Sequence, residues 1–80
     1  MKILKFFSKT CGPCKVLSKN LREANIDVEE IDIQENQELA IKYNIRSVPT
    51  LIKVEGDQVL DRFTGIMNAT QLKDWCNELQ

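Results

Sequence analysis

The chain has 80 residues, a length that predicts a single domain spanning residues 1–80. Its composition of 42% hydrophobic and 29% charged residues is typical of a globular protein, and its formal net charge is −1. A charge so close to zero argues against nucleic acid or an anionic membrane as a partner. No apolar run reaches the roughly 18 residues that a transmembrane helix needs.

The first seven residues are basic and apolar, but they do not fit a signal peptide. Lys5 interrupts a short apolar stretch, and no small-residue cleavage site follows it. We therefore expect a cytoplasmic protein, in a compartment where thiols are kept reduced. Close cysteines in that setting indicate catalysis or metal binding, and the odd total of three cysteines argues against a disulfide framework.

The first half of the chain alternates between strand-like and helix-like hydrophobic periods. Residues 2–7 are apolar and aromatic, which predicts a strand, and residues 11–24 carry leucines on one helical face. In residues 28–33, isoleucines alternate with acids, which predicts a second strand. A short helix is expected over residues 39–43, and it ends near Asn44.

The second half predicts a hairpin and a final helix. Residues 51–54 and 59–63 are expected to be strands joined by a turn at residues 55–57. Asn68 and Gln71 have the spacing of a capping box at the start of a helix. The apolar positions of that helix follow the i, i+3, i+4, i+7 spacing of one face, namely Leu72, Trp75, Cys76 and Leu79.

This order of elements predicts an α/β fold. The first strand, helix and strand imply two parallel strands with a right-handed crossover. The tight turn at Gly56 implies an antiparallel hairpin. We therefore expect one mixed four-stranded sheet with helices on both faces.

A Cys-Gly-Pro-Cys run at residues 11–14 lies between the first predicted strand and helix. Cys11 falls at the helix N-terminus, where unpaired N–H groups and the helix dipole favour a thiolate. Cys14 lies one turn further on the same side, within reach of the Cys11 sulfur. Lys9 and Lys15 flank the motif and add positive potential. The run predicts a redox pair with Cys11 as nucleophile and Cys14 as resolving thiol.

The alternative interpretation of this motif is half of a zinc site. Structural zinc usually takes four Cys or His ligands, but this chain has no histidine and its only other cysteine is Cys76. A dimer that shares cysteines could still complete such a site, although the strand-then-helix context favours redox chemistry, so we expect no metal and no cofactor. Cys76 lies on the apolar face of the last predicted helix, which favours a core position over a redox or regulatory role.

Three segments together resemble the thioredoxin family. Residues 11–14 match its active-site motif letter for letter, and residues 42–51 resemble the stretch that carries its cis-proline. Thr64-Gly65 resembles the glycine loop that faces the disulfide. The resemblance covers essentially the whole chain, without the N-terminal strand and helix of ordinary thioredoxins. It implies a minimal thioredoxin fold of glutaredoxin size, with strand order 2-1-3-4 and strand 3 antiparallel to strand 1.

The resemblance also implies a substrate-binding surface. A proline at a strand start lacks a ladder donor, and in the family a cis bond at this proline exposes backbone that pairs with the substrate. A trans proline at the strand start is the alternative. The residues expected to bind substrate around the Cys11 sulfur are Gly12, Pro13, Val48, Pro49, Gly65 and Ile66.

The chain departs from the family pattern in two respects. Thr10 replaces the usual Trp before the first cysteine, which removes an aromatic lip from the substrate surface. Lys5 stands where thioredoxins have a buried Asp that helps deprotonate the second cysteine, and Glu30 stands where they have its lysine partner. The resemblance therefore implies a buried, charge-swapped pair that tunes Cys14.

The residue pattern supports burial of Lys5 independently. Lys5 alternates with Ile3 and Phe7 on one face of a central strand, where a buried ammonium needs a partner. Glu30 or Asp32 on the neighbouring strand can provide it. The alternative is that the Lys5 side chain extends to water at the sheet end.

The function predicted from these features is reduction of protein disulfides, in which Cys11 attacks and Cys14 resolves the mixed disulfide. The resemblance implies a monomer that receives electrons from a thioredoxin-reductase-type donor. One alternative is a glutathione-linked glutaredoxin, although residues 66–68 after Gly65 lack the usual glycine pair and acids of that family. The other is a non-catalytic thioredoxin-fold binding subunit, for which neither thiol would be needed.

Overall fold

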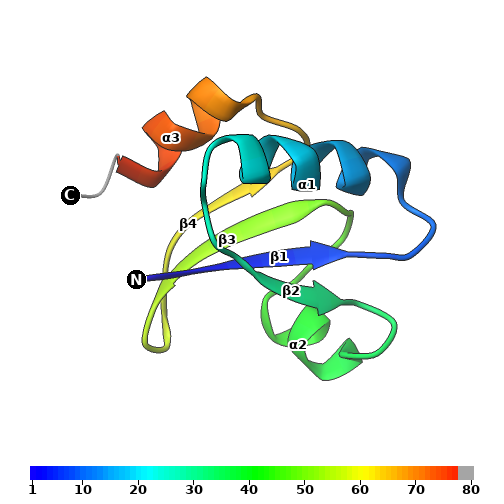
Figure 1. The fold of residues 1–80 in the computed structure, drawn as a ribbon. Helices are drawn as coiled ribbons and strands as arrows, with labels where there is room; N and C mark the ends of the chain where they lie inside the picture. The colour runs from blue at the N-terminus through cyan, green and yellow to red at the C-terminus, as the bar shows by residue number, and fades with distance from the viewer. Residues whose placement is uncertain (78–80) are drawn as a thin grey trace.

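Figure 1 shows the computed structural model of the chain, which describes residues 1–77. A mixed four-stranded sheet carries helices on both faces, which confirms the predicted fold class. Within these 77 residues, no helix is both long and apolar enough to cross a membrane. The elements are β1 (Lys2–Phe7), α1 (Gly12–Glu23), β2 (Glu29–Asp32), α2 (Gln37–Lys42), β3 (Thr50–Glu55), β4 (Gln58–Thr64) and α3 (Ala69–Asn77).

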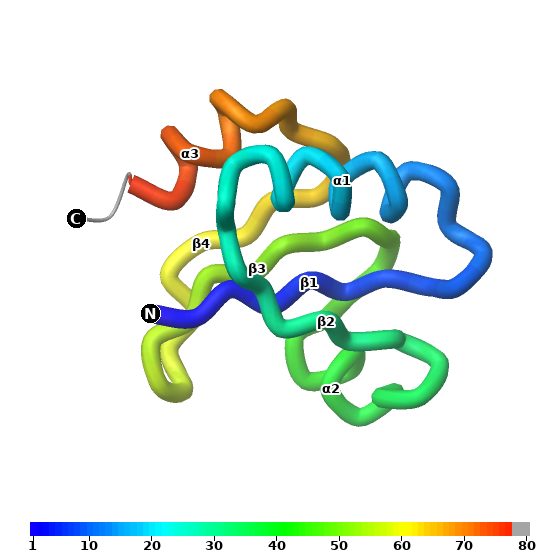
Figure 2. The backbone as a smooth tube through the Cα atoms, viewed as in Figure 1, coloured from blue at the N-terminus to red at the C-terminus, as the bar shows by residue number. Residues whose placement is uncertain are grey.

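The strands lie in the order β2-β1-β3-β4, with β2 parallel to β1 and the other pairs antiparallel. This order confirms the expected topology. The crossover from β1 through α1 to β2 can be followed in Figure 2. Lys5 in β1 lies opposite Glu30 on one side and Leu51 on the other. Position 5 is therefore in the interior of the sheet, whereas β2 and β4 form its edges.

The alternation of side chains along β1 divides the apolar residues between two cores. Ile3 packs under α1 and α3, together with Leu17, Leu21, Leu51, Met67, Leu72 and Trp75. Leu4 and Phe6 face the other side, on which α2 lies, and pack with Ile31, Ile52 and Val54. Each large apolar side chain buried in this way contributes roughly 1.5–3 kcal/mol to stability.

A second buried lysine, Lys53 in β3, attaches α3 to the sheet. Its ammonium donates a hydrogen bond to the carbonyl oxygen of Trp75 and lies 4.3 Å from the centre of the indole ring. The Trp75 indole N–H donates to Asp61 Oδ2 in β4 at 2.9 Å. These polar contacts hold the last turns of α3 over β3 and β4.

Cys76 packs partly buried against the core under α3. Burial raises the pKa of its thiol, and the nearby Lys53 ammonium partly opposes this shift. A thiol with a raised pKa is a poor nucleophile at neutral pH, which agrees with the core position expected for Cys76. Leu79, predicted to share its helix face, lies outside the described residues.

The predicted capping box at the start of α3 is confirmed. The Asn68 N–H donates to Gln71 Oε1 at 3.0 Å, and the Gln71 N–H donates to Asn68 Oδ1 at 2.8 Å. The Asn20 side chain in α1 donates to the Met67 carbonyl oxygen at 2.9 Å. The loop between β4 and α3 is thus held both by α3 and by α1.

We expect Asn68→Ala to lower the free energy of unfolding by about 1 kcal/mol, because it removes the side-chain acceptor of the capping box. Urea denaturation followed by circular dichroism measures the change. Lys73→Ala, at an exposed position within α3, serves as the control and is expected to stay close to the wild type. An Asn68→Ala curve that coincides with that of the control would contradict the capping role.

Candidate active site

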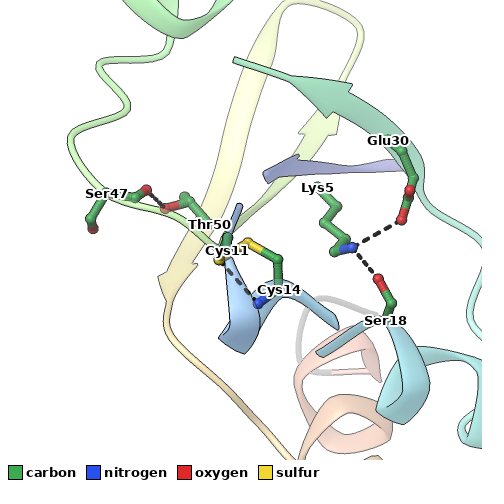
Figure 3. The surroundings of a disulfide bond; sticks show 7 residues. All are labelled: Lys5, Cys11, Cys14, Ser18, Glu30, Ser47 and Thr50. Atoms are coloured by element: carbon green, nitrogen blue, oxygen red, sulfur yellow. Dashed lines mark hydrogen bonds and ion pairs between the residues drawn. A yellow bond between two sulfur atoms is a disulfide. The ribbon is translucent and has the colours of Figure 1, made fainter. Parts of the chain in front are cut away.

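The cysteine pair lies where β1 leads into α1 (Figure 3). Cys11 is the residue directly before α1, with extended backbone angles of φ −88° and ψ 107°. Its sulfur accepts a hydrogen bond from the Cys14 N–H at 3.1 Å, in the manner of a helix cap. A disulfide joins Cys11 and Cys14, whose Cα atoms are 5.3 Å apart. The first turn of α1 therefore holds both sulfurs.

The two cysteines differ in their access to solvent. Cys14 is 2% exposed, whereas Cys11 is only half-buried and is followed by the exposed Gly12 and Pro13. The first turn of α1 contains no acidic residue, so nothing there offsets the positive end of the helix dipole. Cys11 is therefore the more accessible of the two cysteines, and Cys14 is shielded by the rest of the protein.

The loop before β3 belongs to the surroundings of the disulfide, to which Ser47 and Thr50 contribute (Figure 3). The peptide bond between Val48 and Pro49 is cis. The Thr50 hydroxyl donates to the Ser47 carbonyl oxygen at 2.8 Å and closes this loop. The Pro49 carbonyl oxygen accepts a hydrogen bond from the N–H of Gly65 at 3.0 Å.

That last contact joins the proline loop to the loop after β4. Gly65 has φ +117°, a conformation that side-chain-bearing residues rarely adopt. The neighbouring Ile66 is 45% exposed. The fold therefore brings Pro49 and Gly65 together, while substrate binding by the six predicted residues stays a prediction.

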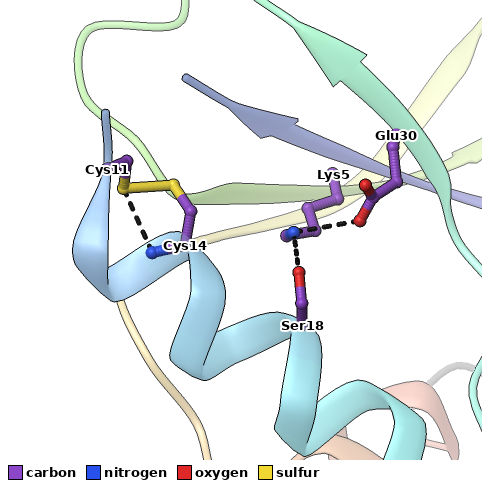
Figure 4. Close-up of polar contacts among 5 residues, drawn as sticks. All are labelled: Lys5, Cys11, Cys14, Ser18 and Glu30. Atoms are coloured by element: carbon purple, nitrogen blue, oxygen red, sulfur yellow. Dashed lines mark hydrogen bonds and ion pairs between the residues drawn. A yellow bond between two sulfur atoms is a disulfide. The ribbon is translucent and has the colours of Figure 1, made fainter. Parts of the chain in front are cut away.

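Lys5 is buried behind the cysteine pair, with a side chain only 2% exposed. Its ammonium donates to the Ser18 hydroxyl of α1 and to Glu30 Oε1 of β2, the latter at 3.0 Å (Figure 4). It also lies 5.3 Å from the centre of the Phe7 ring. The sequence analysis did not identify Ser18, although its position four residues after Cys14 places it on the same face of α1.

The acid in this pair is half-exposed, which corrects the expectation of a buried pair. The Glu30 side chain is 50% exposed because β2 is an edge strand, open to water on its outer side. Asp32, the other candidate acid, forms a hydrogen bond within a turn instead. Its Oδ1 accepts a hydrogen bond from the Gln34 N–H at 2.8 Å in the turn that follows β2.

A pocket of about 210 Å³ lies beside the disulfide, between the start of α1 and β2. It is lined by Lys5, Phe7, Ser8, Lys9, Cys11, Cys14, Lys15, Ser18 and Glu30. A larger hollow of about 520 Å³ is formed by residues 34–39 alone and contains none of the cysteines. The pocket of about 210 Å³ is therefore the candidate site, because both cysteines line it. Among residues 1–77, no three Cys, Asp or Glu side chains are grouped to hold a metal ion.

Comparison with known proteins agrees with this arrangement. The thioredoxin family model matches residues 1–78. The chain belongs to the thioredoxin family. Mitochondrial thioredoxin from Mus musculus is 30% identical over 96% of this chain and 50% of its own length. Thioredoxin from Bacillus subtilis is 32% identical over 91% of this chain and 76% of its own length.

A solved structure of a thioredoxin variant from Halobacterium salinarum superposes on this thioredoxin fold with a TM-score of 0.80 at 31% identity. The match covers 91% of this chain and 68% of the other. The chain spans about half the length of the mitochondrial thioredoxins that it matches. The comparisons therefore show a thioredoxin fold, on which the cysteine pair lies at the start of α1.

The unequal burial of Lys5 and Glu30 predicts unequal effects of removing them. Glu30→Leu leaves a buried ammonium with Ser18 as its remaining hydrogen-bond partner, so we expect the free energy of unfolding to fall by about 1–3 kcal/mol. Lys5→Met leaves a carboxylate that water can solvate, so we expect a change within about 1 kcal/mol. Urea denaturation of the wild type, the two single variants and the double variant measures both effects and their coupling.

Glu29→Leu is the matched control for these variants. Glu29 neighbours Glu30 in β2, and its 3.6 Å pair with Lys2 joins two exposed side chains, so its removal is expected to have little effect. Absence of coupling between positions 5 and 30, or a larger loss for Lys5→Met than for Glu30→Leu, would show that this account of the pair is wrong.

Proposed function

We propose that this protein is a thiol–disulfide oxidoreductase that reduces protein disulfides through a Cys11–Cys14 cycle. The observation that carries the proposal is the unequal placement of the two sulfurs at the start of α1. Cys11 is only partly buried and Cys14 is 2% exposed, and the two are linked as a disulfide. Membership of the thioredoxin family supports the same chemistry.

The cycle begins with the reduced pair. The positive end of α1 favours the Cys11 thiolate, which attacks one sulfur of the substrate disulfide. A mixed disulfide forms, and the other substrate sulfur leaves as a thiolate. Cys14 then loses its proton and attacks the Cys11 sulfur, which re-forms the Cys11–Cys14 disulfide and releases the second substrate sulfur. The substrate gains two electrons and two protons, and the protein becomes oxidised.

Turnover requires a partner that returns two electrons to the oxidised pair. We propose that this partner is a thioredoxin-reductase-type donor. We also propose that the protein acts in electron transport as a monomer. We propose a cytoplasmic location, where the reducing environment favours reduction as the net direction. Some of the relatives are mitochondrial thioredoxins, which belong to another compartment. The residues proposed to bind the substrate beside Cys11 are Gly12, Pro13, Val48, Pro49, Gly65 and Ile66.

The resolving step needs a Cys14 thiolate in a place that water barely reaches, and burial opposes the charged form. Lys5 and Cys14 line the same pocket. We propose that the Lys5 ammonium stabilises the Cys14 thiolate, because an opposite charge nearby favours ionisation. The half-exposed Glu30 offers a second route, in which its carboxylate accepts the Cys14 proton through water.

Reduction of insulin disulfides tests the proposed function. With dithiothreitol as the electron source, the wild type is expected to accelerate insulin precipitation and Cys11→Ser is expected to have no effect. Cys14→Ser is expected to accumulate a mixed disulfide with the substrate, visible on a non-reducing gel, because the resolving thiol is missing. Cys76→Ser is the control and should retain full activity.

Parallel reactions driven by glutathione, or by NADPH with a thioredoxin reductase, identify the class of electron donor. The proposal predicts turnover with the reductase. A wild-type protein that reduces insulin with none of the three donors would overturn the proposed function. Preferential accumulation of mixed disulfide by Cys11→Ser would reverse the assigned roles.

We expect Lys5→Met to slow the resolving step about tenfold, which corresponds to about 1.4 kcal/mol, and to leave the initial attack nearly unchanged. The reason is that Cys11 is activated by the N-terminus of α1, whereas Cys14 faces the pocket that contains Lys5. Rapid-quench measurement of the formation and decay of the mixed disulfide separates the two rates. Lys2→Met, at the exposed end of the same strand, is the control. Equal slowing of both steps would contradict the role of Lys5.

A further inference from the structure

The pocket beside the disulfide carries more positive than negative charge. Its lining contains three lysines and a single carboxylate, that of Glu30, which is already paired with Lys5. Lys9 approaches the Glu35 carboxylate only at 3.9 Å, and both side chains are more than 60% exposed. Lys15 forms no ion pair with any other residue in positions 1–77.

The backbone adds to this charge. The N-terminus of α1 is at the pocket, and the absence of acidic residues in its first turn leaves its positive end uncompensated. The whole chain has a formal net charge of −1. The positive potential is therefore a local property of the site and does not reflect a generally basic protein.

The dimensions of the pocket limit what it can hold. Its volume of about 210 Å³ is below the range of about 300–1,000 Å³ that is usual for small-molecule sites. Both cysteines of the pair line the pocket, and the Phe7 side chain forms an apolar part of its wall. A pocket of this size and charge suits one side chain with a short apolar stem and an anionic end, delivered by a molecule that also presents a disulfide to Cys11.

We propose that the pocket binds an acidic side chain of the substrate next to the cysteine under attack. The Glu or Asp carboxylate lies near Lys9 and Lys15, and its methylene groups contact Phe7. This inference rests on the proposed function and adds a substrate preference to it. It makes Lys9 and Lys15 specificity-determining residues that take no part in the exchange of sulfur bonds.

A set of three disulfide peptides tests the preference. The peptides differ only in the residues that flank the cysteine, which are Glu, Gln or Lys. We expect kcat/KM for the Glu peptide to exceed that for the Gln peptide roughly fivefold at low ionic strength, and the Lys peptide to be the poorest substrate. The difference should shrink at high salt, because exposed charges are screened.

The Lys9→Gln, Lys15→Gln double variant supplies the decisive readout. Its ratio of kcat/KM for the Glu and Gln peptides is expected to fall to about one, while reduction of the Gln peptide continues. The ratio is the quantity compared, because any change in the reactivity of Cys11 affects both peptides alike. Lys19→Gln, an exposed position further along α1 and outside the pocket, is the matched control and should keep the wild-type ratio.

The outcomes separate this inference from the proposed function. Equal kcat/KM for all three peptides with the wild type, or a preference that survives in the double variant, would overturn the inference and leave disulfide reduction intact. Reduction of none of the peptides would overturn the proposed function and the inference together. Loss of the preference in Lys19→Gln would show that net charge, and not the pocket, selects the substrate.

Discussion

The hydrogen bond from the Cys14 N–H to the Cys11 sulfur, at 3.1 Å, ties the cysteine pair to the first turn of α1. It exists because α1 begins directly after Cys11, at the end of the short connection from β1. An N–H group at a helix start has no partner within the helix, so a sulfur placed there replaces a conventional cap. The same N–H groups favour the thiolate once the disulfide is reduced.

The remainder of the site depends on where this connection leaves the two sulfurs. Cys14 points inward because it lies on the buried face of α1. The same face carries Leu17 and Leu21, which pack in the core. Cys11 stays only partly buried because it precedes the helix. The proline loop and the Gly65 loop are joined by a backbone hydrogen bond, and the first of them lies beside the disulfide.

Two buried lysines show how a small core accommodates charge. Lys53 has no carboxylate partner among residues 1–77 and relies on a helix carbonyl and an indole ring. Lys5 has a hydroxyl partner and a half-exposed carboxylate. Both ammonium groups lie on the face of the sheet covered by α1 and α3, but only Lys5 reaches the pocket of the cysteine pair. A buried charge is tolerated when hydrogen bonds replace part of its lost hydration.

Much of this protein was determined by local sequence. Hydrophobic periodicity and turn signals identified the four strands and the first two helices to within one or two residues, and the capping box identified the start of α3. The Cys-Gly-Pro-Cys run, placed between a strand and a helix, identified the reactive pair. The capping box at Asn68 was also visible, because both its partners lie within four residues.

The tertiary structure decided what depends on pairing across the chain. The family resemblance implied Lys5 and Glu30 as partners, and the residue pattern left Asp32 as an alternative. Neither could show that Glu30 is half-exposed, since that follows from the edge position of β2. Ser18 and the Lys53–Trp75 contact were not predicted, because each joins segments more than ten residues apart and neither was implied by the family resemblance. The pocket beside the disulfide exists only where α1, β1 and β2 meet. Local patterns specify the elements, and the charge and access of the site arise from the way the sheet and α1 pack together.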